Sequence, residues 1–219
     1  MICKITLMKR MMMYYNDRKK ELDTLINITQ WANKERLTPA TGGNFSIRYD
    51  DQACLVTASG VDKGSLDTSH FIKVDWQQSV LAGEGSPSAE TGIHTCLYEL
   101  DTHIVSVCHT HSLSATVLSR LTTDDWLYIN GWEMQKTQSG IKSHESRLSL
   151  AVFDNDQNIT CLADEIKARW AIQPLQHGIL IRGHGLYSWS YAMDKAQMNL
   201  EGLIFLLYCE LAKQQLEQR

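Results

Sequence analysis

Several kinds of segment are missing from this 219-residue chain, and each absence excludes a class of protein. No apolar run approaches the roughly 20 residues that cross a bilayer, so no membrane span is expected. No basic tract carries interleaved aromatic residues, and the formal net charge is −4, which argues against nucleic-acid binding. No GxxxxGK[ST] segment is present, so a P-loop is excluded. Only three prolines occur, which indicates a compact chain with short connections.

Paired cysteines are also absent, because the six cysteines are scattered and none form a CxxC motif. The first 13 residues lack a long apolar segment that ends in small residues, so we do not expect a signal peptide. The cysteines are therefore interpreted as reduced, buried thiols of a cytoplasmic protein. We expect residues 1–15 to be a disordered extension and residues 16–219 to form a single domain.

Helical and strand-like patterns alternate along the rest of the chain. The predicted helices are Asp17–Arg36, Ser88–Leu100, Ser112–Leu121, Leu162–Ile172 and Met193–Gln218. The predicted strands are Phe45–Tyr49, Ala53–Thr57, Phe71–Asp75, Ser79–Leu81, Ile104–Cys108, Leu127–Ile129, Leu148–Phe153 and Gly178–Ile181. The hairpin around residues 50–51 and the short loops require some antiparallel pairing. The sequence thus predicts an α/β domain with a mixed or antiparallel sheet covered by helices.

Three histidines follow two of the predicted strands. His109 and His111 come directly after an apolar strand, and residues two apart in an extended segment point the same way. His184 lies between two glycines after another apolar strand. Three imidazoles with one open position are typical of a catalytic zinc site, although imidazole also suits iron, copper and nickel. The alternative is a chance HxH of solvated loop residues, and the second strand that ends in a histidine favours the metal.

Small polar segments at residues 41–46, 57–60 and 86–88 offer backbone N–H groups and hydroxyls that suit a phosphate, although each alone is more often an ordinary turn. Glu90 lies in the first turn of a predicted helix. It is either aligned with the helix dipole or a carboxylate that moves a proton near the metal. His94, four residues later, is interpreted as a helical partner of Glu90 and not as a ligand. Glu133 lies between aromatic and apolar neighbours, a setting that would raise its pKa and suit general acid catalysis.

Five of these segments occur in an order that resembles the class II aldolase/epimerase (fuculose-phosphate aldolase-like) superfamily, from about Leu22 to the closing helix. They are Gly43–Ser46, Thr57–Gly60, Ser88–Glu90, His109–His111 and Gly183–Gly185. The resemblance implies a three-layer α/β/α fold with a largely antiparallel central sheet. It also implies a homotetramer with its site near a subunit interface. It further implies that His109, His111 and His184 bind one zinc ion per subunit. The substrate phosphate would be held near Asn44, Ser59, Gly60 and Ser88.

Within that superfamily the chain resembles the sugar-phosphate dehydratases of methionine salvage. The segments that carry this resemblance are Pro87–Thr91, Gly131–Lys136, His144–Glu145, Phe153–Gln157 and Arg182–Trp189. It implies that 5-methylthioribulose 1-phosphate loses water to give 5-methylthio-2,3-dioxopentyl phosphate, with Glu133 as the general acid/base. Glu90 matches the catalytic carboxylate of the aldolases. The candidates for contact with the methylthio end are Trp126, Trp132, Tyr187 and Trp189.

Two other functions share some of these motifs. A zinc-dependent sugar-phosphate aldolase or a pentulose-phosphate 4-epimerase would have the same metal and phosphate residues, and Glu133 with its neighbours distinguishes the dehydratase from them. A non-catalytic interaction domain, as in the adducin head, has the same fold but lacks the metal histidines. All three histidines are present here, which disfavours that alternative. A metal-free structural protein ranks last.

Overall fold

The computed structural model describes residues 16–217, so the extension predicted for residues 1–15 lies outside the described residues. Within residues 16–217, nine strands form one sheet in the order β4-β3-β2-β1-β5-β9-β8-β7-β6. All neighbouring strands pair antiparallel except β7 and β8, which are parallel. The strands are β1 (Asn44–Arg48), β2 (Ala53–Thr57), β3 (Phe71–Asp75), β4 (Val80–Ala82), β5 (Ser106–Thr110), β6 (Trp126–Ile129), β7 (Leu148–Phe153), β8 (Gly178–Ile181) and β9 (Gly185–Ser190).

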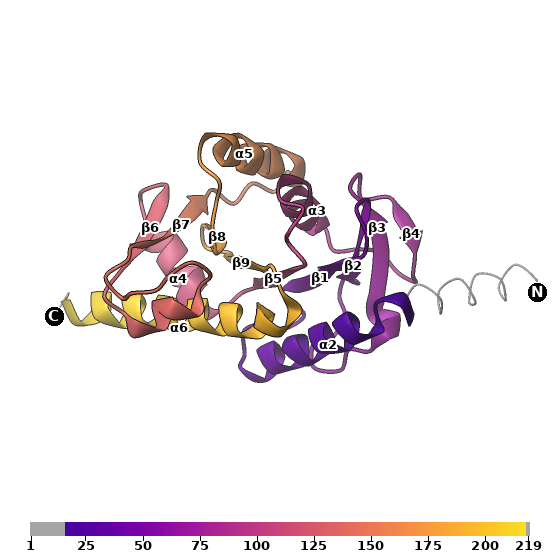
Figure 1. Ribbon diagram of the computed structural model, residues 1–219, viewed down its shortest axis with the longest axis horizontal. Helices are drawn as coiled ribbons and strands as arrows, with labels where there is room; N and C mark the ends of the chain where they lie inside the picture. The colour runs from indigo at the N-terminus through magenta and orange to yellow at the C-terminus, as the bar shows by residue number, and fades with distance from the viewer. Residues whose placement is uncertain (1–15, 218–219) are drawn as a thin grey trace, which may run out of the picture.

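Helices cover both faces of this sheet, as Figure 1 shows, with α3 and α5 on one side and α2, α4 and α6 on the other. Two hydrophobic clusters correspond to the two interfaces between sheet and helices. The helices are α2 (Lys19–Lys34), α3 (Thr91–Leu100), α4 (Leu113–Leu121), α5 (Ile159–Ile172) and α6 (Met193–Glu217), with short 3₁₀ helices η1 (Thr68–His70) and η2 (Glu133–Thr137). The arrangement confirms the three-layer α/β/α fold with a largely antiparallel sheet.

Hydrophobic spacing explains how α2 attaches to the sheet. Leu22, Leu25, Ile28 and Ala32 recur every three to four residues, so they lie on one face of the helix and are buried there. Each buried Leu or Ile side chain contributes roughly 1.5–3 kcal/mol relative to an exposed one. No helix within residues 16–217 is both long and apolar enough to cross a membrane.

The main difference from the predicted elements is β9, which the sequence interpretation omitted. Its six residues are all buried, and it forms a tight hairpin with β8 in which Ile181 pairs with Gly185. Aromatic and serine residues alternate along residues 187–190, which is a strand pattern. The sequence interpretation considered only the glycines that flank His184, as a place where the backbone approaches a ligand, and assigned no element to residues 186–190. The strand matters for function, because β9 pairs with β5 and so joins the two segments that carry the histidines.

The bounds of two elements at the site also differ from prediction. Strand β5 spans Ser106–Thr110 and not Ile104–Cys108, so His109 lies inside the strand. Helix α3 begins at Thr91 and not at Ser88, and Glu90 occupies its N-cap position. The Ser88 hydroxyl oxygen instead accepts a 3.3 Å hydrogen bond from the backbone N–H of Glu90. As a result, residues 88–90 form a turn that leads the Glu90 side chain into the site described next.

Candidate metal centre

Strand pairing brings the three histidines together. His109 lies in β5 opposite Tyr187 of β9, and His111 follows the end of β5. His184 occupies the turn between β8 and β9. Because β5 and β9 are antiparallel neighbours, the end of β5 lies beside the start of β9, and the turn before β9 overhangs it. Helix α4 fixes this turn, since the Thr116 hydroxyl donates to the His184 carbonyl oxygen at 2.9 Å.

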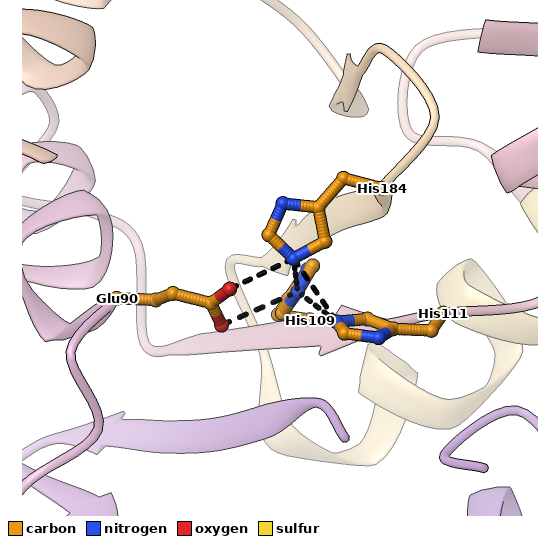
Figure 2. Close-up of side chains that lie close together, drawn as sticks. All are labelled: Glu90, His109, His111 and His184. Carbon is orange, nitrogen blue, oxygen red and sulfur yellow. Dashed lines mark hydrogen bonds and ion pairs between the residues drawn. The ribbon is translucent and has the colours of Figure 1, made fainter. Parts of the chain in front are cut away.

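The three imidazoles converge through the same ring atom, as Figure 2 shows. The Nε2 atom of His109 lies 2.8 Å from that of His111 and 3.3 Å from that of His184, and the last two are 3.1 Å apart. In a tetrahedral zinc site, nitrogens bound at about 2.0–2.1 Å lie about 3.3 Å from one another. The Nδ1 atom of His109 donates to the carbonyl oxygen of Leu186 at 3.0 Å, so its Nε2 presents a lone pair. These donors fit one small divalent ion.

Burial keeps two of these rings uncharged. It lowers the pKa of His109 well below the ordinary histidine value, even though the nearby Glu90 carboxylate opposes that shift. Burial and the neighbouring His184 also lower the pKa of His111. Only the neutral imidazole binds a metal, so both rings are in their ligating form at neutral pH.

Glu90 completes the cluster from the N-cap position of α3. Its Oε1 atom lies 2.7 Å from Nε2 of His184, and its Oε2 atom lies 3.4 Å from Nε2 of His109 (Figure 2). Burial alone would raise the pKa of Glu90. The hydrogen bond from His184, the electrostatic interactions with His109 and His184, and the hydrogen bond from Asn44 outweigh burial and hold this pKa at about 2. The carboxylate is therefore ionised, and it is able to bind a cation or accept a proton.

A buried hydrogen-bond network orients the Asn44 amide toward Glu90. The Asn44 amide nitrogen donates to Oε2 of Glu90 at 2.5 Å and to the Ser88 hydroxyl at 3.0 Å. Its carbonyl oxygen faces Nε2 of His94, whose other ring nitrogen lies 2.7 Å from the Ser46 hydroxyl. The interpretation of His94 as a helical partner of Glu90 is wrong, because His94 contacts Asn44 and Ser46. Burial holds the pKa of His94 at about 3, so the ring is neutral.

A cavity of about 300 Å³ opens beside this cluster and is lined in part by His111 and Glu90. Its volume suits a small ligand. All four residues predicted to hold phosphate, Asn44, Ser59, Gly60 and Ser88, contribute to its lining. The structure therefore brings the predicted metal and phosphate residues to one place.

Lys63 lines the same cavity, and the sequence interpretation did not single it out. Its side chain is only 1% exposed. The ammonium group donates to the carbonyl oxygens of Thr41 at 3.0 Å and Val61 at 2.9 Å. Its position three residues after the Ser59-Gly60 pair was the only sequence signal, and lysines in polar loops are usually solvated.

The structure does not bring Glu133 to the cluster within one chain. Glu133 begins η2, its side chain is 71% exposed, and its Oε1 atom lies 2.5 Å from Nζ of Lys136. It is not among the residues that line the cavity. The expected apolar setting and raised pKa are wrong for the single chain, because the hydrogen bond from Lys136 lowers the pKa of Glu133.

The predicted methylthio contacts are also distributed away from the cavity, and none of the four lines it. Trp132 donates to Glu210 of α6 at 2.7 Å, and Trp189 is buried against α5 through Trp170. Tyr187 stacks on the ring of His109, with ring centroids 4.0 Å apart. Tyr187 therefore packs against the ring of His109, a candidate metal ligand, and does not face the cavity as a substrate contact.

Comparisons with known proteins agree with this geometry. Residues 23–211 match the family described as the class II aldolase and adducin N-terminal domain. A methylthioribulose-1-phosphate dehydratase of Serratia proteamaculans is 46% identical over 200 residues, which cover 91% of this chain and 98% of that protein. A protein of the same name from Yersinia enterocolitica is 45% identical over 197 residues, covering 90% of this chain and 94% of that protein.

Solved structures share the fold. The L-fuculose-1-phosphate aldolase of Thermus thermophilus has a TM-score of 0.74 at 19% identity, over 92% of this chain and 99% of that one. A sugar-phosphate aldolase of Thermotoga maritima has a TM-score of 0.66 at 16% identity, over 90% and 96% of the two chains. Together these matches confirm the resemblance that the sequence motifs indicated.

Proposed function

The chain belongs to the class II aldolase and adducin N-terminal domain family, and from that premise we propose that it is a metal-dependent lyase that removes water from 5-methylthioribulose 1-phosphate. The product would be 5-methylthio-2,3-dioxopentyl phosphate, an intermediate of methionine salvage in the cytoplasm. The observation that carries the proposal is the convergence of three imidazoles and Glu90 beside a cavity lined by the four residues predicted to hold phosphate. The 46% identical relative named as this dehydratase supports the substrate.

We propose zinc as the metal, one ion per subunit, held by Nε2 of His109, His111 and His184. The basis is the donor set, because three imidazole nitrogens within 3.3 Å of one another suit Zn²⁺. Bound there, the ion supplies a Lewis acid that polarises a substrate carbonyl oxygen and makes the adjacent C–H bond more acidic.

The chain's own residues bind and orient the substrate. Asn44, Ser59, Gly60 and Ser88 hold its phosphate, which fixes the sugar relative to the metal and lowers the entropic cost of alignment. Glu90 lines the cavity and is ionised, so we assign it the proton that leaves C3. The electron pair of that C–H bond forms the enol, and the C4 hydroxyl departs as water with a proton from Glu133. The enol then becomes the 2,3-diketone.

Glu133 enters this scheme from a neighbouring subunit. Within one chain it is exposed and lies outside the cavity. An exposed acid can reach a site on another copy, where contact with that copy would remove the water around it and raise its pKa. We therefore propose a homotetramer in which the site lies near a subunit interface.

A turnover assay tests the proposed function directly. Purified protein is incubated with 5-methylthioribulose 1-phosphate, and the diketone is followed with and without a chelator. We expect turnover that is lost with the metal and regained when Zn²⁺ is restored. Absence of diketone from a fully metallated protein would rule the reaction out.

The same assay separates the rival functions. A sugar-phosphate aldolase would release an aldehyde and a three-carbon ketone phosphate, and a 4-epimerase would return an isomer of unchanged mass. A non-catalytic domain like the adducin head would bind no metal and turn over no substrate, and the four convergent donor side chains argue against it.

A further inference from the structure

The environment of the Lys63 ammonium group differs from that of an ordinary lysine. The side chain is 1% exposed, and its two hydrogen bonds go to uncharged carbonyl oxygens of Thr41 and Val61. Among residues 16–217, none of the ion pairs involves Lys63. Burial lowers the pKa of Lys63, and the charges of Asp62 and Glu90 offset this only in part.

Such an arrangement is costly unless something else supplies negative charge. A buried ammonium group loses hydration, and residues with buried charges are normally paired. The ammonium also has three N–H donors, of which the two carbonyl oxygens use two. The third donor remains for a group in the cavity that Lys63 lines.

Lys63 also has a structural role, because its two hydrogen bonds tie the loop at Thr41 to the loop at Val61. A carbonyl-binding role alone does not require a charge, since a neutral amide would make the same bonds. The charge of the Lys63 ammonium group is instead explained by the electrostatics of the cavity. The carboxyl group of Glu90 lines this cavity and would repel an anion that entered it. A cation in the same wall reduces that repulsion.

We propose that Lys63 is the cationic contact for a phosphate dianion bound in this cavity, alongside the hydroxyl of Ser59 and the backbone of Gly60. The proposal rests on the proposed function for the identity of the phosphate carrier. It makes Lys63 the residue that selects the phosphorylated ketose over the free sugar. A lysine ammonium group acts as a point charge on phosphate, and a bond between charged partners in a buried site is roughly twice as strong as a neutral one.

The first experiment measures binding of inorganic phosphate to the metal-loaded protein by calorimetry. Lys63→Met keeps the length of the side chain and removes its charge, and Lys213→Met removes a charge from an exposed position of α6 as the matched control. We expect Lys63→Met to weaken phosphate binding about 10- to 100-fold, the effect of one charge-assisted hydrogen bond, and Lys213→Met to leave it unchanged. Equal affinities in a folded Lys63→Met protein would overturn the proposal.

A second measurement separates phosphate contact from loop positioning. The kcat/KM of Lys63→Met is compared with that of the unchanged protein on 5-methylthioribulose 1-phosphate and on 5-methylthioribulose without phosphate. A phosphate contact predicts a loss of about 10- to 100-fold for the phosphorylated sugar only, mainly in KM. Equal losses on both sugars would reduce Lys63 to a structural residue.

The unchanged protein gives a test that does not depend on folding of Lys63→Met. In a sample with ¹⁵N-labelled lysine, phosphate should shift the Lys63 ammonium resonance, which Lys63→Arg identifies by its disappearance. A resonance that phosphate does not move would contradict the contact. The two proposals fail separately, because phosphate binding through Lys63 does not require turnover, and diketone formation without a role for Lys63 would leave the dehydratase function intact.

Discussion

The burial of individual histidines sets their protonation, and protonation sets what they do. Both His109 and His111 have a pKa lowered by burial, so neither must lose a proton before it binds a metal. His94 is neutral for the same reason, and its neutral ring can donate to Asn44 while it accepts from Ser46. The same lowering of the pKa by burial thus makes His109 and His111 candidate metal ligands and makes His94 a neutral residue that positions Asn44.

Removal of one imidazole should release the metal. In His184→Ala, two nitrogens remain where three converged, so we expect metal affinity to fall at least about 100-fold and turnover to fall with it. Metal per subunit after dialysis against a weak chelator measures the effect. His103→Ala is the matched control, because His103 is exposed and contacts only its neighbour Asp101. Full metal content in His184→Ala would remove this residue from the proposed site.

The burial of His94 should make the stability of the metal-free protein depend on pH. The folded pKa is about 3, against an ordinary value of 6.5. As pH falls below about 6.5, the unfolded chain takes up a proton at His94 that the folded protein does not, so unfolding is increasingly favoured down to about pH 3. The folded-to-unfolded ratio should fall by about a factor of ten per pH unit from this residue.

Urea unfolding at pH 7 and pH 5, with chelator present, measures that dependence. We expect the free energy of unfolding of His94→Gln to depend less on pH than that of the unchanged protein. The difference should correspond to about one proton, whatever the stability of the variant at pH 7. His103→Gln, at an exposed position, should retain the full slope. An identical slope in His94→Gln would show that the ring is protonated in the folded protein.

At the scale of elements, the β8–β9 hairpin is the part of the fold on which the site depends most. It places His184 over the end of β5, and α4 anchors its turn through Thr116 and Ser119. A β-carbon at Gly185 would collide with the carbonyl oxygen of Thr110 in the paired strand. Gly183 has a φ of +64°, which is a left-handed backbone conformation. A β-carbon added there would meet only the Arg120 side chain, at an ordinary contact distance of 3.6 Å.

These two glycines form a matched pair for mutation. Gly185→Ala should cost about 3 kcal/mol, because backbone of a central strand cannot move aside, and it should displace His184 and reduce metal content. Gly183→Ala should cost about 1 kcal/mol from the left-handed backbone alone and retain the metal. Urea unfolding and metal analysis of both variants check this, and equal metal content would mean that the close contact does not control His184.

The hairpin also shows where local sequence patterns reach their limit. Strand β8 was predicted with its observed bounds because a run of apolar residues ends at a glycine-containing turn. Strand β9 was not predicted, although apolar and hydroxyl residues alternate in its second half. Its Ser190 hydroxyl is buried and accepts a hydrogen bond from Asn199 of α6, and no local pattern reports such burial.

At the scale of the whole molecule, the proposed site requires more than one copy of the chain. Glu90 lies in the cluster, whereas Glu133 is exposed outside it. If Glu133 acts in the site of a neighbouring subunit, Glu90→Gln and Glu133→Gln damage different halves of each active site. Each variant alone should lose about 10²- to 10⁴-fold in kcat with its metal content intact.

Hybrid tetramers of the two variants provide the test. Co-expressed with different tags and purified together, they should regain about a quarter of the normal activity, because that share of sites combines an intact Glu90 with an intact Glu133 from another subunit. Hybrids of Glu90→Gln with His184→Ala serve as the control, because both residues lie in the cluster of one chain and no site in such hybrids would be intact. Hybrids that stay inactive would contradict a role for Glu133 across the interface.

The sequence by itself determined the donor groups, most strand positions and the order of the motifs, because hydrophobic periodicity and side-chain chemistry are local properties. It placed His109, His111 and His184 at strand ends and Asn44, Ser59, Gly60 and Ser88 in turns. Only the tertiary structure decided which of them meet. Distances between ring nitrogens follow from the pairing of β5 with β9, and the burial of Lys63 and exposure of Glu133 follow from how distant loops pack. Contacts between segments far apart in the chain arise only when the whole sheet has formed.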